Sequence, residues 1–173
     1  SGVSAISDTD AGADYVLENS GVSTPVGITA NATDPDGTDT ITYSLDDTAG
    51  GRFAIDANTG VVTVNGALDY ETAISHSITV RASSADGSFS TQAFTISVTD
   101  VNESGVSAIS DSDAGADYVS ENSVVGTTVG ITANATDPDG TDTVSYSLDD
   151  NAGGRFAIDA NTGVVTVNGA IDR

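Results

Sequence analysis

The chain has 173 residues, of which 38% are hydrophobic, and it contains no Cys, Met or Trp. Twenty-six acidic residues face four arginines and no lysine, so the formal net charge is -22. This charge disfavours nucleic acid and anionic membranes as partners, because phosphate binding needs clustered Lys and Arg. Without cysteine, disulfides, thiol catalysis and zinc thiolate sites are excluded. No run of about eighteen apolar residues is present, so we expect no membrane insertion.

The first seventy residues return 103 positions later without a gap. Residues 1–70 align with residues 104–173, and 70 − 10 = 60 positions are identical, with differences at positions 9, 17, 21, 23, 25, 41, 42, 48, 68 and 70. A repeat of this length indicates tandem copies of one domain. We expect one complete repeat at residues 1–103 and a second copy at 104–173 that stops before its last two strands. In that copy, core residues are expected to be partly uncovered: Val129, Ile131 and Phe156.

Alternation of apolar and polar residues with a period of two runs through the first repeat and predicts strands. In chain order these are residues 3–6, 15–17, 26–32, 40–45, 52–56, 61–64, 75–82 and 91–98. Turn signals such as Asp34-Pro35-Asp36-Gly37 and Asn65-Gly66 separate them. Short strands with such turns over about a hundred residues predict an all-β fold, a Greek-key β-sandwich of the immunoglobulin-like kind. The side chains predicted to face the core are Val26, Ile28, Ala30, Ile41, Tyr43, Leu45, Phe53, Ile55, Ile78, Val80, Phe94, Ile96 and Val98.

An acidic stretch interrupts the chain after the first predicted strand. It contains Asp8, Asp10 and Asp14, and the second copy repeats it as Asp111, Asp113 and Asp117. Two interpretations stay open, a solvated acidic bulge and a small Ca²⁺ loop. The spacing is not that of an EF-hand loop, because the central Gly and the terminal Glu do not fall in register.

Carboxylates recur in four places along the repeat. The sets are Glu18; Asp34, Asp36 and Asp39; Asp69 and Glu71; and Asp100, Asn102 and Glu103. In a sandwich of alternating strands, the first, third and fourth sets gather at one end and the second set lies at the other. With a second unit stacked head to tail, the gathered sets face Asp137, Asp139 and Asp142. Carboxylates this close repel one another, and Ca²⁺, which takes six to eight oxygen ligands, relieves the repulsion.

These motifs, in this order, resemble the cadherin repeat over the whole of the first unit. Its units carry Glu-Asn near the start, Asp-x-Asp after the second strand, then Leu-Asp-Arg-Glu, and a closing Asp-x-Asn-Asp-Asn. Residues 43–47, 50–56 and 58–64 are similar to the Asp-rich cadherin-like repeats of giant bacterial surface and secreted proteins. The resemblance implies a cluster of Ca²⁺ ions at each junction between repeats.

Each family position finds a match in this sequence. The opening Glu corresponds to Glu18 and Glu121, and Asp-x-Asp corresponds to Asp34 with Asp36 and to Asp137 with Asp139. The acids of Leu-Asp-Arg-Glu correspond to Asp69 and Glu71, and in the second copy to Asp172. The closing motif corresponds to Asp100 and Asn102, and Asp39 and Asp142 stand where the family often has Asn. Glu103 replaces the second Asp of the closing motif. Ser84 stands where an Asp is usual, with Asp86 two residues later, and this departure puts a third ion in doubt.

The resemblance implies a non-enzymatic, calcium-binding repeat of a large bacterial cell-surface adhesin. Such a module is extracellular, stiffens an extended array and supports cell adhesion. Its partners would be neighbouring repeats, copies of itself or a cell-surface polysaccharide. The alternative is a carbohydrate-binding β-sandwich, which the 5% aromatic content and the lack of Trp disfavour. A hydrolase is disfavoured because the single histidine, His76, has no predicted nucleophile beside it.

Overall fold

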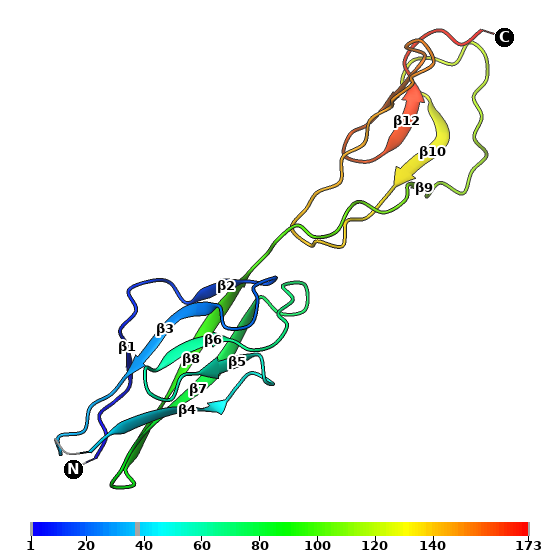
Figure 1. Cartoon of the computed structure of the whole chain (residues 1–173). Coiled ribbons are helices and arrows are strands. Elements are labelled where there is room, and N and C mark those ends of the chain that lie inside the picture. The colour runs from blue at the N-terminus through cyan, green and yellow to red at the C-terminus, as the bar shows by residue number, and fades with distance from the viewer. Residues whose placement is uncertain (1, 37–38, 173) are drawn as a thin grey trace. The chain divides into compact units, whose positions relative to one another are not determined.

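The structure is a computed structural model that describes residues 2–36 and 39–172. It divides into two compact units, Ser1–Val101 (unit 1) and Asn102–Arg173 (unit 2) (Figure 1). Gly37 of the first predicted turn and Arg173, which ends the second copy, lie outside the described residues.

Unit 1 is a sandwich of two four-stranded sheets. One sheet has the order β1-β3-β6-β5 and the other β2-β8-β7-β4. The strands are β1 (Ser7–Asp8), β2 (Tyr15–Leu17), β3 (Pro25–Asn31), β4 (Ile41–Asp47), β5 (Phe53–Ile55), β6 (Val61–Val64), β7 (Ser75–Ser84) and β8 (Phe89–Thr99). The chain changes sheet at every step from β1 to β5 and again from β6 to β7 (Figure 1). The all-β sandwich predicted from alternation is confirmed.

The core of unit 1 lies between these two sheets. Val26, Ile28 and Phe53 from the first sheet meet Ile78 and Ile96 from the second, and all five are almost fully buried. Of the other side chains predicted to face inward, Ala30, Tyr43, Val80 and Val98 are buried, while Ile41, Leu45, Ile55 and Phe94 are partly buried against the cluster. The period-two pattern therefore identified the correct face of each strand.

The start of unit 1 differs from the prediction. Residues 3–6 form no strand; instead β1 covers Ser7–Asp8, which pairs with Asn31 and Ala30 of β3. Farther upstream the Val3 N–H donates to the Ser88 hydroxyl, at 3.3 Å, so it makes no ladder bond. The chain then crosses to the second sheet, where β2 pairs with β8 in parallel. At this crossing Gly27 has φ +84° and lies so close to the Ala13 carbonyl that a Cβ would clash.

Unit 2 forms a single four-stranded sheet with the order β11-β12-β10-β9. Its strands are β9 (Ser110–Asp111), β10 (Thr128–Asn134), β11 (Phe156–Ile158) and β12 (Val164–Val167), which correspond to β1, β3, β5 and β6. The residues that correspond to β2 and β4, 118–120 and 144–150, form no strand. In unit 1 these two strands pair only with β8 and β7, and residues 104–173 contain no counterpart of either.

The small core of unit 2 lies on one face of its single described sheet. Val129, Val165 and Val167 are buried, while Ile131 and Phe156 are only partly buried. The expected exposure is therefore confirmed for Ile131 and Phe156 and wrong for Val129, which β12 covers through its pairing with β10. No helix in the described part of the chain is long and apolar enough to cross a membrane.

Candidate metal centres

Glu18 is a buried carboxylate at the end of β2. Its side chain is only 2% exposed. Its Oε2 accepts the backbone N–H of Tyr70 at 2.7 Å, and its Oε1 accepts the N–H of Val101 at 2.8 Å. Buried carboxylates are tolerated when hydrogen bonds replace lost water. Glu18 thus ties the loop after β6 to the last residue of unit 1.

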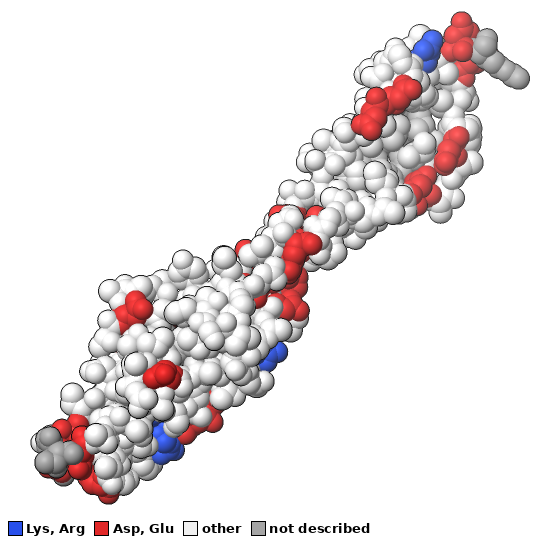
Figure 2. Space-filling view, viewed as in Figure 1, with Lys and Arg blue, Asp and Glu red and all other residues white. Residues whose placement is uncertain are grey.

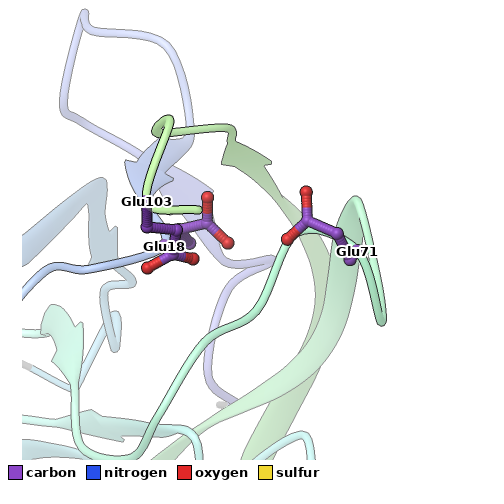
Figure 3. Close-up of side chains that lie close together, drawn as sticks. All are labelled: Glu18, Glu71 and Glu103. Atoms are coloured by element: carbon purple, nitrogen blue, oxygen red, sulfur yellow. The ribbon is translucent and has the colours of Figure 1, made fainter. Parts of the chain in front are cut away.

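Glu71 and Asp69 lie on the loop that Glu18 holds. One oxygen of Glu71 is within 4.8 Å of one oxygen of Glu18, and Figure 3 shows both side chains. Asp69 bonds instead to Thr72, through the Thr72 hydroxyl at 2.6 Å and its N–H at 3.1 Å. These bonds hold the pKa of Asp69 below its ordinary value. Asp69 is therefore ionised and exposed, yet it is engaged in closing its own turn.

A second acidic cluster lies at the other predicted place in unit 1. Asp34, Asp39 and Asp86 each place one oxygen within 4.8 Å of the others. Oδ2 of Asp34 is buried and accepts no hydrogen bond from the described residues. Hydrogen bonds from the hydroxyl and N–H of Ser88 lower the pKa of Asp86, so that carboxylate is negatively charged. Asp36, the second acid of Asp-x-Asp, is exposed. Its backbone N–H donates a hydrogen bond to Oδ1 of Asp34, with an N–O distance of 3.0 Å.

Unit 2 carries the third cluster, made of Asp137, Asp139 and Asp142, again with oxygens within 4.8 Å of one another. Asp139 is 2% exposed, and its Oδ2 accepts the N–H of Glu103 at 2.9 Å and of Ser104 at 2.8 Å. The side-chain amide of Asn102 donates to Asp142. The first residues of unit 2 are therefore fastened to its acidic cluster.

The remaining predicted ligands lie in less enclosed places. Asp100 follows β8 and is half-buried, whereas Glu121 is exposed although its counterpart Glu18 is buried. Glu121 lines a shallow pocket together with Asp172 and Ile171. Glu18 accepts the N–H of Val101, and residues 104–173 contain no counterpart of that residue. Whether the ligand sets of the two units face each other stays a prediction.

The early acidic stretch has a structural task in both units. Oδ1 of Asp8 accepts the N–H groups of Asp10 and Thr29, both at 2.9 Å, and Oδ1 of Asp10 accepts that of Gly12. Burial, followed by the charge of Asp8, raises the pKa of Asp14. In unit 2, Asp111 and Asp113 make the corresponding bonds. These carboxylates shape the crossing from the first strand, and whether they also bind metal stays open.

The charge distribution of unit 1 is uneven. Figure 2 shows acidic side chains gathered at its lower-left end, while the basic side chains lie along its flank. Arg81 forms a bidentate ion pair with Asp46, at 2.7 Å, and its guanidinium carbon lies 4.0 Å from the centre of the Phe89 ring. Sequence reasoning did not find this pair, because the two partners are 35 residues apart and meet only through the pairing of β4 with β7. Asp46 belongs to none of the three acidic clusters.

Comparisons with known proteins agree with this architecture. Residues 15–99 match the model of the cadherin domain. Protocadherin Fat 4 of Homo sapiens is 40% identical over 131 residues, which cover 70% of this chain and 2% of that protein. Cadherin-23 of Mus musculus is 34% identical over 163 residues, which cover 90% of this chain and 5% of that protein. The chain thus spans a small part of these relatives.

A solved structure extends the likeness to the fold. The crystal structure of mouse Cadherin-23 EC22-24 matches with a TM-score of 0.76 and 30% identity, covering 98% of this chain and 56% of that one. The sequence resemblance to the cadherin repeat is confirmed by these matches.

Proposed function

Because residues 15–99 form a cadherin domain, a domain typical of adhesion proteins, we propose that this chain is a calcium-binding repeat module of a large bacterial cell-surface adhesin. In this proposal Ca²⁺ stiffens the connection between consecutive extracellular repeats and so supports adhesion at a distance from the cell. Neighbouring repeats are the first partners, and copies of the same module on other cells are the second.

One observation carries the proposal: a buried carboxylate in each unit holds the chain that connects the units. Glu18 binds the N–H of Val101, the last residue of unit 1. Asp139 binds the N–H groups of Glu103 and Ser104, the second and third residues of unit 2. A cation that held these two carboxylates in place would also restrain the backbone of residues 101, 103 and 104, whose N–H groups they accept.

The side chains fit a hard cation of the calcium class. Every candidate ligand is a carboxylate or amide oxygen, and no sulfur or imidazole is among them, which matches the preference of Ca²⁺. The buried Oδ2 of Asp34 accepts no hydrogen bond from the described residues. Buried polar atoms usually have a partner, and a bound metal ion would supply one here. The residues proposed to hold Ca²⁺ are Glu18, Asp69, Glu71, Asp100, Asn102 and Glu103; Asp137, Asp139 and Asp142; Asp34, Asp36, Asp39 and Asp86; and Glu121 and Asp172.

The expected strength follows from mass action. Extracellular modules bind Ca²⁺ with dissociation constants of about 10⁻⁴ to 10⁻³ M. At about 1 mM Ca²⁺ each filled site then stabilises the folded state by about 0.4 to 1.4 kcal/mol. Several sites on one connection give a combined effect large enough to alter its flexibility.

The proposal is tested by measuring the distance between the units with and without Ca²⁺. The chain has no native cysteine, so spin labels can be placed at the exposed positions Ser77 and Asn161 through S77C and N161C. Double electron–electron resonance should give a broad distance distribution in EDTA and a narrower one in Ca²⁺, with little change in Mg²⁺. The doubly labelled chain with D139N should stay broad in Ca²⁺.

Calorimetry on the unlabelled chain separates binding from stiffening. Heat of Ca²⁺ binding without any narrowing would contradict the mechanical part of the proposal. No calcium heat at all would contradict the proposal as a whole. The matched control is D149N, which removes an exposed acid of unit 2 that lies outside its three-carboxylate cluster and is not among the proposed ligands, so the narrowing should stay largely intact.

A further inference from the structure

Ser84, the last residue of β7, carries a buried hydroxyl group next to the acidic cluster of Asp34, Asp39 and Asp86. The residue is 8% exposed, and its Oγ has no hydrogen-bond partner of normal geometry among the described residues. Buried hydroxyl groups usually have such a partner, because the loss of water is otherwise uncompensated. A hydroxyl group that stays unpaired in this position is therefore available to a bound ligand.

Two contacts place the Ser84 hydroxyl at the cluster. Ser84 pairs with Ile41, the first residue of β4, so it lies across from the segment that carries Asp39. Hydrogen bonds from Ser88 are the main cause of the lowered pKa of Asp86, and the nearby Ser84 hydroxyl adds a smaller contribution. The hydroxyl therefore lies beside the Asp86 carboxylate.

The turn between β7 and β8 holds Ser84 in this place through backbone contacts. The Ser84 N–H donates to the Ser88 carbonyl at 2.9 Å, and the Ser84 carbonyl accepts the Gly87 N–H at 3.1 Å. Gly87 has φ +90°, a conformation that glycine adopts without steric conflict. The Ser88 N–H also donates to Oδ1 of Asp86, at 2.7 Å. One closed turn thus presents both the hydroxyl and the Asp86 carboxylate to the cluster.

A second buried oxygen of the cluster is unpaired as well. Oδ2 of Asp34 accepts no hydrogen bond within the described part of the chain. Asp34 follows β3 and Ser84 ends β7, and these strands belong to different sheets. A hydroxyl could donate to a carboxylate, yet these two oxygens do not satisfy each other. A cation would satisfy both, because it interacts with the lone pairs of each oxygen.

We propose that the Ser84 hydroxyl is a neutral ligand for a cation of the calcium class bound by Asp34, Asp39 and Asp86, and that this hydroxyl destabilises the fold when no cation is bound. The inference rests on the proposed function and adds to it a ligand that is not an acid. A hydroxyl oxygen, like water, is a neutral hard ligand of the kind that Ca²⁺ accepts. It completes the site without adding to the repulsion among three carboxylates.

The variant Ser84→Ala separates a ligand from a residue that only supports the fold. In EDTA it should raise the urea midpoint of unit 1, followed at amides of β7, because an unpaired buried hydroxyl is removed. In Ca²⁺ it should weaken binding at this cluster by about threefold or more, since a water that replaces the hydroxyl loses entropy. A residue with a purely structural role would not change stability and affinity in these opposite senses.

The variant Ser84→Asp should show the reverse pair of effects. A fourth carboxylate lowers the urea midpoint in EDTA through repulsion. It should also strengthen Ca²⁺ binding by about tenfold or more, because affinity rises with the number of charged ligands. The matched control is Ser83→Asp, since Ser83 is the neighbouring residue of β7, is less buried and pairs with Phe89. An acid there should change the affinity by less than about threefold, because solvent and salt screen its charge.

Site-specific affinities come from nitrogen-15 NMR titrations of the full chain with CaCl₂. The amides of Asp86, Gly87 and Ser88 lie in the turn that presents the hydroxyl, so their shifts report this cluster. The amide of Val101 donates to Glu18 and reports the other proposed ligand set of unit 1. The two affinities are therefore measured in one titration.

The outcomes distinguish this inference from the proposed function. Unchanged affinity at residues 86–88 in Ser84→Ala would overturn the inference, and so would a lower urea midpoint of that variant in EDTA. These two measurements decide the matter even where Ser84→Asp does not fold. If Ca²⁺ shifts the Val101 amide but not residues 86–88, the inference fails and the proposed function stands. If it shifts neither, both fail.

Discussion

Replacing Glu18 by alanine tests whether this buried carboxylate organises the end of unit 1 even without metal. The change removes the acceptor for two N–H groups, those of Tyr70 and Val101. Hydrogen bonds to a charged group contribute about 1.5 to 3 kcal/mol each. Because relaxation and water entry recover part of this, we expect a loss of about 3 kcal/mol in the free energy of unfolding of unit 1. Glu18→Gln keeps one acceptor oxygen and should lose about half as much.

Hydrogen exchange within β7 reports this loss for unit 1 alone, because unit 2 has no counterpart of that strand. In EDTA, about 3 kcal/mol corresponds to roughly a hundredfold faster exchange of amides that open only on global unfolding. Glu121→Ala is the matched control, since Glu121 occupies the same repeat position but is exposed. It should alter stability by less than about 0.5 kcal/mol. Equal exchange in the two variants would refute the role given to Glu18.

Three further outcomes follow from the same contacts. Phe53→Ala should destabilise unit 1 by about 3 to 5 kcal/mol. Phe156→Ala should destabilise unit 2 by less than half of that, because Phe156 is partly exposed. Urea unfolding followed by hydrogen exchange measures the two units separately. Burial and the nearby Arg52 charge lower the pKa of His76, so folding disfavours its protonated form. The free energy of unfolding of unit 1 should therefore fall as the pH drops below about 6.5. With H76Q, the urea midpoint should change less between about pH 7.5 and 5.5 than it does in the unmodified chain. Asp139→Ala should speed amide exchange at residues 103 and 104 by about tenfold or more, since each N–H loses a charged acceptor, whereas Asp36→Ala, at the matched exposed position, should not.

Most strands of unit 1 could be predicted because each carries its own pattern. β2 and β6 were predicted with their true bounds. β3, β4, β5, β7 and β8 were predicted to within about two residues at each end, which is the usual uncertainty of boundaries. The first strand was not, since alternation at residues 3–6 cannot reveal that Val3 bonds to the hydroxyl of Ser88. That contact joins residues 85 positions apart.

The sequence identified the acidic residues that form the clusters, but only partly which of them lie close together. The sequence grouped Asp34 and Asp39 correctly, but it placed Asp36 with them. The cluster takes Asp86 instead, which arrives from the turn between β7 and β8. In unit 2 the same motif keeps its second acid, Asp139, within the cluster. Asp139 also accepts hydrogen bonds from outside the motif, from the backbone N–H groups of residues 103 and 104.

The two copies separate what a sequence specifies locally from what it specifies through its partners. The segment at β4 and its counterpart at 144–150 differ only by Ile41 against Val144 and Thr42 against Ser145, both conservative exchanges. One is a strand and the other is not, although the tyrosine anchor is the same in both. By contrast β5 and β6 have strand counterparts in β11 and β12, because those strands pair with each other within the shared seventy residues. Strand formation in this repeat therefore follows the presence of a pairing partner, and local propensity only makes the segment ready to accept one.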